Sequence, residues 1–197
     1  LLISENQKIE INLGSLYEYR YGGEMIYGPA HLSMQSEERI HDIKLGNLDY
    51  QIDFNQGKTS LVSYLAAQKT KRKHYTGIRP EIGTSEDIDF LSSPPYGRSI
   101  NVTRQGGVQV NHKLNTFNRS NLITIGSEYI SDLIIDEILS YNYLVDQKTG
   151  VLAAFIQSDL DLSENVNFLS GFRFDKHSML DNTILSPRFS LLYRLKG

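Results

Sequence analysis

The chain has 197 residues, a formal net charge of −3 and no cysteine, so the sequence excludes a disulfide scaffold and a cysteine-based zinc site. The charge balance gives no indication of nucleic-acid binding. No run of about 18 apolar residues occurs, which excludes a transmembrane helix but not a membrane β-barrel, whose strands alternate apolar and polar residues.

Alternation of apolar and polar residues predicts strands along most of the chain, and no segment keeps a helical period. In the second predicted strand the apolar residues change parity near Gly46, and a β-bulge there would restore a single apolar face. The predicted strands, in chain order, are about 8–21, 43–54, 59–72, 99–115, 121–131, 152–162, 166–175 and 189–195.

The strand predicted over 99–115 shows the pattern most clearly. Its even positions include Val102, Val108 and Val110, whereas its odd positions carry no hydrophobic residue. It is much longer than the usual strand of about 5–6 residues. A long strand that is apolar along one side and polar along the other is typical of a barrel wall between lipid and an aqueous lumen.

The predicted links alternate between short and long. Short turns are expected at 55–58, 116–120 and 163–164, and long irregular links at 22–37, 73–97, 132–149 and 176–185. In an antiparallel meander successive links lie at opposite ends, so the short turns share one end and the long loops the other. Outer-membrane barrels have this plan, with short periplasmic turns and longer extracellular loops. The sequence thus predicts an all-β, antiparallel up-and-down meander of about eight long strands, part of a large transmembrane β-barrel.

Two other architectures fit the alternation. A soluble β-sandwich or β-barrel, such as a carbohydrate-binding module, would bury Val108, Phe168, Phe172 and Leu191 together in one core. A membrane barrel would point these side chains outward. A small closed eight-stranded membrane barrel would also accommodate the predicted strands.

The C-terminal part of the chain resembles TonB-dependent outer-membrane receptors, the group of receptors for ferric siderophores, colicins and cobalamin. The resemblance lies in Arg-Phe-Asp-Lys-His at 173–177, followed by Ser186-Pro187-Arg188 and a Leu-Tyr strand. Tyr17–Gly23 and Gln68–Gly77 are similar to earlier barrel strands of the same group. Such receptors have a plug domain and a barrel of about 22 strands. The resemblance therefore implies that residues 1–197 are a partial β-barrel domain without the plug.

The resemblance also implies a function. We expect a receptor in the outer membrane of a Gram-negative bacterium that imports a metal chelate such as a ferric siderophore, with cobalamin or haem as the alternative. Its partners would be outer-membrane lipid, the chelate and, through the plug, the TonB complex, with no nucleic acid and no cofactor. The residues assemble no nucleophile with a base and an orienting acid, so we expect no enzyme.

Ligand contacts are expected near the extracellular ends of the strands and in the long loops. The basic run at 69–74 would lie at an outer strand end, where it could meet lipid headgroups or an anionic ligand. Arg173 and Asp175 share one parity and are expected to form a charge network on the lumenal wall. The five histidines show no metal-ligand spacing, so no metal site is expected. The ligand-contact candidates are His74, Tyr75, Tyr96, Tyr141, Tyr143 and His177.

Overall fold

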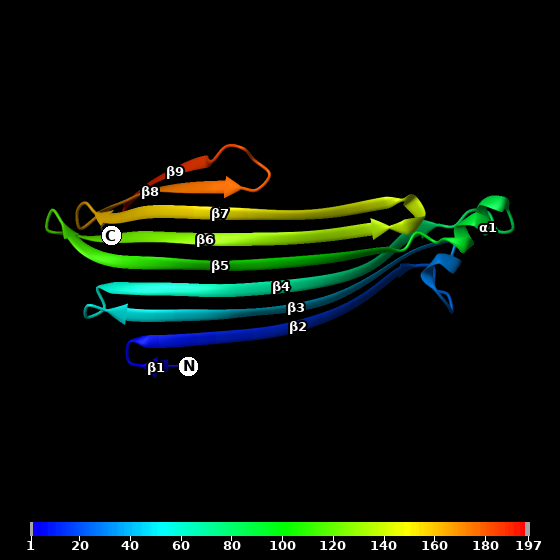
Figure 1. The fold of residues 1–197 in the computed structure, drawn as a ribbon, viewed down its shortest axis with the longest axis horizontal. Helices are drawn as coiled ribbons and strands as arrows, with labels where there is room; N and C mark the ends of the chain where they lie inside the picture. Colours follow the sequence, from blue (N-terminus) through cyan, green and yellow to red (C-terminus); the bar gives the residue numbers. More distant parts are fainter. Residues whose placement is uncertain (1, 196–197) are drawn as a thin grey trace.

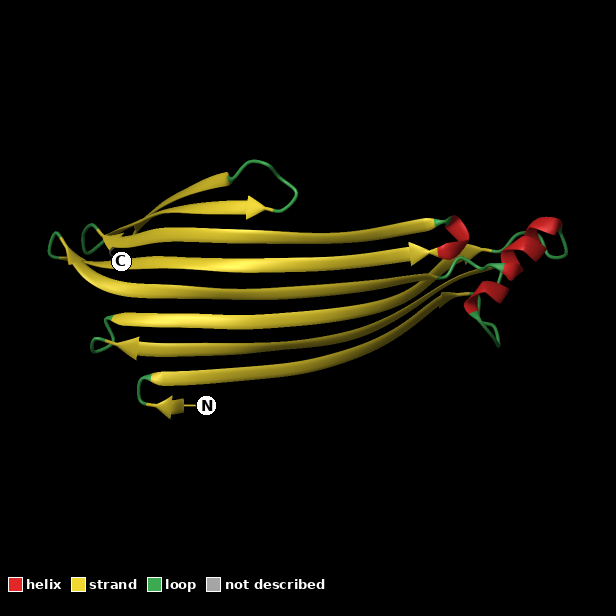
Figure 2. Ribbon diagram, in the orientation of Figure 1, coloured by secondary structure: helices red, strands yellow, loops and turns green. Residues whose placement is uncertain are grey.

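The computed structural model describes residues 2–195, and Leu1, Lys196 and Gly197 lie outside the described part. Within it the strands form one antiparallel sheet in which each strand pairs with its neighbours in the chain, from β1 to β9 (Figures 1 and 2). The predicted up-and-down meander is confirmed. The strands are β1 Leu2–Ser4, β2 Gln7–Gly23, β3 Gln35–Phe54, β4 Thr59–Ile78, β5 Gly97–Thr116, β6 Arg119–Ile138, β7 Tyr143–Asp161, β8 Val166–His177 and β9 Ile184–Tyr193.

The register between β3 and its neighbours is uninterrupted, so the β-bulge predicted near Gly46 is wrong. Gly46 pairs directly with Leu13 on β2 and Ala67 on β4. The change of parity has a packing cause instead. Leu45 covers Gly14 on one face, where a Cβ atom at Gly14 would lie 3.2 Å from its side chain, and Leu13 covers Gly46 on the other face. The two leucines thus occupy space that the two glycines leave open.

The two longest connections lie at one end of the sheet, and the connections at the other end are all short (Figure 1). At one end, which we call the turn end, lie the turn around Gly57, the two-residue turn Phe117-Asn118 and residues 162–165. Phe117 and Asn118 have φ of 53° and 58°, the left-handed conformation that a two-residue hairpin of type I′ requires. At the other end, the loop end, lie residues 24–34, 79–96 and 139–142, whereas residues 178–183 join the shorter strands β8 and β9 partway along the sheet (Figure 1).

The long link predicted over 132–149 is wrong. The structure continues β6 to Ile138 and begins β7 at Tyr143, with the 3-10 turn η2 Leu139–Tyr141 between them. Both faces of this hairpin carry apolar residues, so apolar and polar residues no longer alternate in the sequence. The backbone pairing of β6 with β7 nevertheless continues to Ile138 and Tyr143. The loop between β4 and β5 contains a helix that alternation did not predict, α1 Ser85–Ser92. The Thr84 side chain caps it by accepting a hydrogen bond from the Asp87 backbone N–H.

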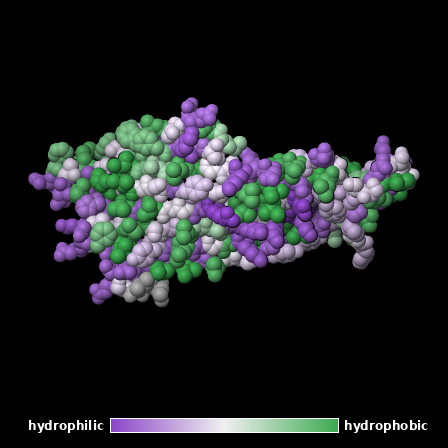
Figure 3. Space-filling model, viewed as in Figure 1, coloured by the Kyte–Doolittle hydropathy of each residue, from purple (hydrophilic) through white to green (hydrophobic). Residues whose placement is uncertain are grey.

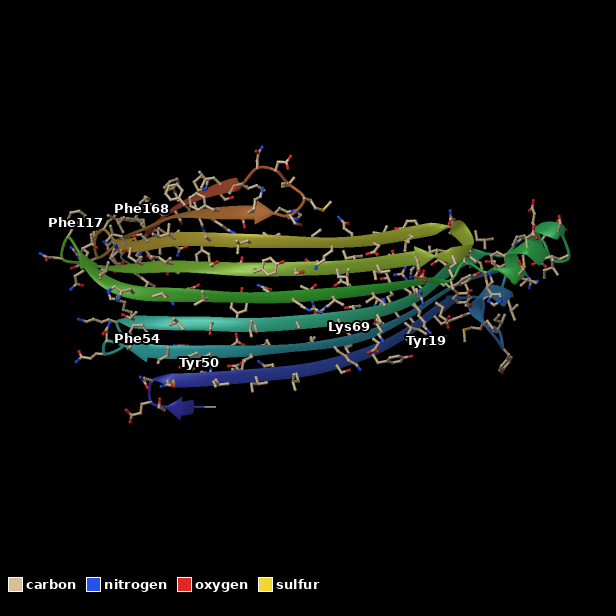
Figure 4. The ribbon with its side chains drawn as sticks, viewed as in Figure 1. Tyr19, Tyr50, Phe54, Lys69, Phe117 and Phe168 are labelled. Carbon is tan, nitrogen blue, oxygen red and sulfur yellow. The ribbon has the colours of Figure 1, made fainter. Side chains whose placement is uncertain are left out.

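The sheet has an apolar face and a polar face. Ile11, Leu48, Leu65, Gly106 and Tyr129 follow one another across five strands and represent the apolar face, because directly paired residues share a face. Figure 4 labels Tyr19, Tyr50, Phe54, Lys69 and Phe168, which belong to this face by the same register. The strand residues between these rows form the other face, which we call the polar face; it carries polar side chains such as Gln105 and Glu128 and also apolar ones such as Leu45 and Ile134.

No second layer of structure covers the apolar face within residues 2–195. Among the described residues the buried hydrophobic side chains are only Ala30, Tyr75 and Ala153. Val108 and Phe172 are each 44% exposed, and Leu191 is 66% exposed. These side chains therefore lie on an uncovered face of the sheet and do not form the single core of a β-sandwich.

The sheet is open within residues 2–195, because β1 and β9 at its two edges do not pair with each other. The small closed eight-stranded barrel is therefore not the observed architecture. In the part of the chain that the structure describes, no helix has the length and apolar character needed to cross a membrane. The loop end also contains the short turn η1 Ala30–Leu32, which lies between β2 and β3.

Candidate functional site

The polar face carries a charge network in the middle of the sheet, and it confirms the one predicted around Arg173 and Asp175. The Arg173 guanidinium donates to Asp175 at 2.9 Å and also to Glu128 two strands away. The Tyr64 hydroxyl donates to Glu128 at 3.0 Å and accepts from the Gln105 amide at 2.9 Å. The network links β4, β5, β6 and β8, so it holds the polar wall in one register.

A second group of polar side chains lies on the polar face near the loop end. We call His41, Arg72, His74 and Asp136 the polar-face cluster. The ladder aligns His41 of β3 with Arg72 of β4, and Ser99 of β5 connects that row to Asp136 of β6. His74 lies over Gly97 of β5, where an added Cβ atom would come within 2.2 Å of its Nε2 atom. The glycine is therefore needed for the position of the imidazole.

The polar-face cluster is incompletely paired. Arg72 approaches Asp136 at 3.8 Å, and Nδ1 of His41 lies 3.5 Å from the Glu18 carboxylate. Within residues 2–195, four buried atoms of the cluster have no hydrogen-bond partner, namely His41 Nε2, Arg72 Nε, His74 Nδ1 and Asp136 Oδ1. Buried polar atoms are nearly always hydrogen-bonded, so four such atoms on neighbouring strands indicate a surface that can bind a polar ligand.

A cavity of about 880 Å³ opens at the loop end beside this cluster. Thr76, which lines it, is two residues beyond His74 on the same strand face. Glu37 also lines it and forms an ion pair with Arg39, which is directly opposite His74 in the ladder. The cavity, which we call the loop-end cavity, is lined by Gly22, Gly23, Glu24, Met34, Gln35, Ser36, Glu37, Thr76, Gly77, Ile78 and Tyr141.

An ion pair fixes the two loops that border this end of the sheet. Arg79 donates to the two carboxylate oxygens of Asp87 at 2.5 and 2.9 Å, and also to the Leu32 carbonyl of the other loop at 3.1 Å. The Gly83 N–H donates to Asp87 at 3.0 Å. These donors lower the pKa of the Asp87 carboxyl, the hydrogen bond from Arg79 most of all, and Asp87 in turn raises the pKa of Arg79.

Two of the predicted ligand contacts, Tyr75 and Tyr96, pack against each other, and Tyr96 also lines a cavity of about 370 Å³. The rings of Tyr75 and Tyr96 lie 4.9 Å apart, and the Tyr96 hydroxyl is 3.1 Å from His31 Nδ1. Tyr75 is fully buried, and its hydroxyl has no hydrogen-bond partner in the described chain. Burial, followed by the nearby Arg79 charge, lowers the pKa of His31 and favours its neutral form. The stack holds the loops on the strands, so ligand contact at Tyr75 would require the loops to move.

The other predicted contacts occupy three different places. Tyr141 lines the loop-end cavity and is 65% exposed, and His74 belongs to the polar-face cluster beside it. Tyr143 is exposed at the start of β7. His177 ends the shorter strand β8 opposite Val151, about 25 Å along the strands from Tyr143. The structure thus brings His74 and Tyr141 near one site and leaves His177 apart from it.

The predicted ligand contacts omitted His41, Arg72 and Asp136. Alternation contained the signal for Arg72, because Arg72 shares the polar-face parity of His74 on β4, whereas 69, 71 and 73 have the apolar-face parity. Whether His41 and Arg72 come near Asp136 depends on the registers of the pairs β3–β4, β4–β5 and β5–β6. No group of three or more His, Cys, Asp or Glu residues in the described part of the chain could hold a metal ion.

Comparison with known proteins identifies the fold. No protein-family model and no curated protein matches the sequence. The structure is similar to the crystal structure of the siderophore receptor PirA from Acinetobacter baumannii, with a TM-score of 0.70 and 12% sequence identity. The match covers 99% of this chain and 30% of that receptor, so the chain spans less than a third of its length. The likeness shows that the sheet has the form of a barrel segment of a receptor.

Proposed function

We propose that residues 1–197 are a partial barrel domain of a TonB-dependent receptor in the outer membrane of a Gram-negative bacterium, where it takes up a metal chelate. A ferric siderophore is the preferred cargo, with cobalamin or haem as the alternative. In this proposal the loop end faces the outside, and a plug domain and the TonB complex act together with the wall. The observation that supports the proposal most is the set of unpartnered buried atoms in the polar-face cluster beside the loop-end cavity.

The chemistry of the cluster suits an anionic chelate. The Nε–H group of Arg72 has no acceptor in the described chain, and His41 and His74 each keep one ring nitrogen unpaired. Hydrogen bonds from a guanidinium to carboxylate or phenolate oxygens are strong because they are charge-assisted. Asp136 Oδ1 can accept a hydrogen bond from an amide or hydroxyl of the same ligand. The loop-end cavity has the volume of a small-molecule site, about 300–1,000 Å³.

The opposite face suits lipid. On β5 the even-numbered positions from Gly106 to Leu114 belong to the apolar face and, apart from His112, carry no polar side chain. A segment of this length rises about 30 Å, and a strand tilt of about 45° reduces this to about 21 Å across the membrane. An outer-membrane barrel has an apolar band about 25 Å tall. The strands also extend well beyond this band toward the loop end.

The chelate proposal can be tested with Arg72→Gln in the full-length receptor. Equilibrium binding would be measured with a ferric catecholate, a ferric hydroxamate, cobalamin and haemin. We expect one of these chelates to bind the unaltered receptor, and we expect Arg72→Gln to weaken that binding about tenfold or more, because a charge-assisted hydrogen bond is lost. Lys71→Gln is the matched control, since it removes the adjacent charge from the opposite face. Binding of none of the four chelates, or equal binding by both variants, contradicts the proposal.

A further inference from the structure

The first part of β7 has a neighbouring strand on one side only. β7 begins at Tyr143, near the loop end, whereas its pairing with β8 begins only at Val151, opposite His177. On its other side β7 pairs with β6 all the way to Tyr143, opposite Ile138. Figure 1 shows that β8 and β9 both reach only partway along β7. We call residues 143–149 the open edge, and its length is about 23 Å.

The backbone groups that point to the open side belong to alternate residues. The Ser178 N–H donates to the Gly150 carbonyl at 2.7 Å, and the Gly150 N–H donates to the Ser178 hydroxyl at 2.9 Å. Gly150 therefore directs both of its backbone groups to the β8 side. Because this direction repeats at every second residue of an antiparallel strand, the N–H and C=O groups of Leu144, Asp146 and Lys148 point the same way. Within residues 2–195 no backbone hydrogen bond satisfies them.

The open edge begins where the apolar band ends. Leu152 of β7 lies in the row of Leu65 and Tyr129 on the apolar face, and β8 pairs with β7 from Val151 to Asp161. In Figure 3 hydrophobic colours predominate over the turn-side half of the molecule, and hydrophilic residues become frequent farther along the strands toward the loop end. Hydrocarbon does not tolerate an unpaired strand edge, whereas an edge in water is a template for another chain.

The side chains of the open edge carry charges that their neighbours do not balance. Leu144, Asp146 and Lys148 lie on the apolar face, and all three are exposed. The residues of β6 that pair directly with Asp146 and Lys148 are Ile135 and Leu133, which carry no charge. Opposite charges in directly paired positions stabilise a sheet. A strand added to the open edge therefore fits best with a base opposite Asp146 and an acid opposite Lys148.

We propose that the open edge binds an extended segment of a partner protein outside the cell, which adds one strand to the sheet. The segment runs antiparallel to β7, in line with β8, and from its N-terminus it carries an acid, a base and an apolar residue at alternate positions. Backbone hydrogen bonds to Leu144, Asp146 and Lys148 supply affinity, and the alternate side chains supply specificity. The proposal rests on the proposed function for one point, namely that the loop end faces outside.

A second copy of the receptor does not satisfy the open edge. Two copies in one membrane have the same orientation, so their β7 strands could pair only in parallel. A two-fold axis along the membrane normal would then place Asp146 beside Asp146 and Lys148 beside Lys148. Like charges in such positions are destabilising. A flexible segment has neither restriction, because it can adopt the extended conformation and the required direction as it binds.

Fluorescence anisotropy of a labelled peptide with the full-length receptor in detergent micelles tests the proposal. The probe is Thr-Glu-Val-Lys-Val-Leu-Thr, which places Glu opposite Lys148, Lys opposite Asp146 and Leu opposite Leu144. The control peptide exchanges Glu and Lys. We expect the probe to bind more tightly than the control by about fivefold or more, because two charge pairs distinguish them. Asp146→Lys/Lys148→Glu should reverse this preference, since it exchanges the charges of the open edge.

Asp146→Pro tests the backbone contact. It removes the Asp146 N–H, which points to the open side, and leaves the hydrogen bonds between β6 and β7 in place. Asp146→Ala is the matched control, because it removes the same charge and keeps the N–H. We expect Asp146→Pro to weaken probe binding about fivefold more than Asp146→Ala does.

Three results would overturn the proposal: no binding of the probe to the unaltered receptor, equal binding of the two peptides, or equal binding of the probe by Asp146→Pro and Asp146→Ala. Chelate binding measured on the same preparations separates this proposal from the proposed function. Asp146→Lys/Lys148→Glu should leave chelate binding unchanged, because both side chains lie on the face opposite the polar-face cluster. Chelate binding without peptide binding would therefore reject the open edge alone.

Discussion

The bidentate ion pair between Arg79 and Asp87 is extended by two further hydrogen bonds. Arg79 donates to the Leu32 carbonyl, and Asp87 accepts from the Gly83 N–H. The folded pKa of Asp87 is lowered below its unfolded value of about 3.9. The pair therefore stabilises the loops fully above this pH, and the contribution is lost as the pH falls through the lower folded pKa.

A spin label can report this loss. The chain has no cysteine, so Ile88→Cys, an exposed position on α1, accepts a single label. We expect the label to become more mobile as the pH falls through the lowered folded pKa of Asp87, below the unfolded value of about 3.9, and we expect Asp87→Asn to make it mobile at every pH. Asp89→Asn, on the same helix, should keep the behaviour of the unaltered chain. A mobility that is independent of pH and equal in all three proteins would show that the pair does not order the loop.

The assignment of the apolar and polar faces can be tested with substitutions on a single strand, β5. Val110 lies on the apolar face of β5 and Gln109 on the polar face, where its amide donates to Asn111 at 2.8 Å. We expect Val110→Arg to lower the free energy of unfolding of the full-length receptor in lipid vesicles by about 2–4 kcal/mol, as for a cation in the middle of the bilayer.

Gln109→Arg is the control, because it places an arginine at the neighbouring position of β5, on the polar face. It should change the free energy of unfolding by much less than Val110→Arg. Reversible unfolding in urea, followed by far-ultraviolet circular dichroism, measures both variants. A larger loss for Gln109→Arg would mean that the two faces have been assigned in the wrong order.

The β6–β7 hairpin shows why strand ends are hard to predict. Alternation predicts a strand only where one face is apolar and the other polar. Toward the loop end Ile134 and Ile135 of β6 lie on opposite faces, so the alternation disappears there. Pairing with β5 and β7 extends the strand there, and pairing is a property of three segments together. The helix α1 was missed for a related reason, since its capping residue Thr84 is a local signal that apolar periodicity does not register.

The open sheet exposes two edges and one broad apolar face, within residues 2–195. Unpaired strand edges and large apolar patches promote association in water. We expect residues 1–197 expressed alone to aggregate in aqueous buffer and to keep their β-structure only in detergent micelles. Size-exclusion chromatography with circular dichroism, with and without detergent, tests this. A stable monomer without detergent would contradict the assignment of the apolar face to lipid.

The sequence by itself determined the all-β class, the antiparallel meander and the apolar band, because side chains on a strand alternate between faces at every residue. It also placed Arg173 and Asp175 on one face, since they are two residues apart on one strand. Only the tertiary structure decided which strands bring Arg72 to Asp136. The physical reason is register: a shift of one residue between two strands moves every side chain to the other face, and backbone pairing over whole strands sets that shift.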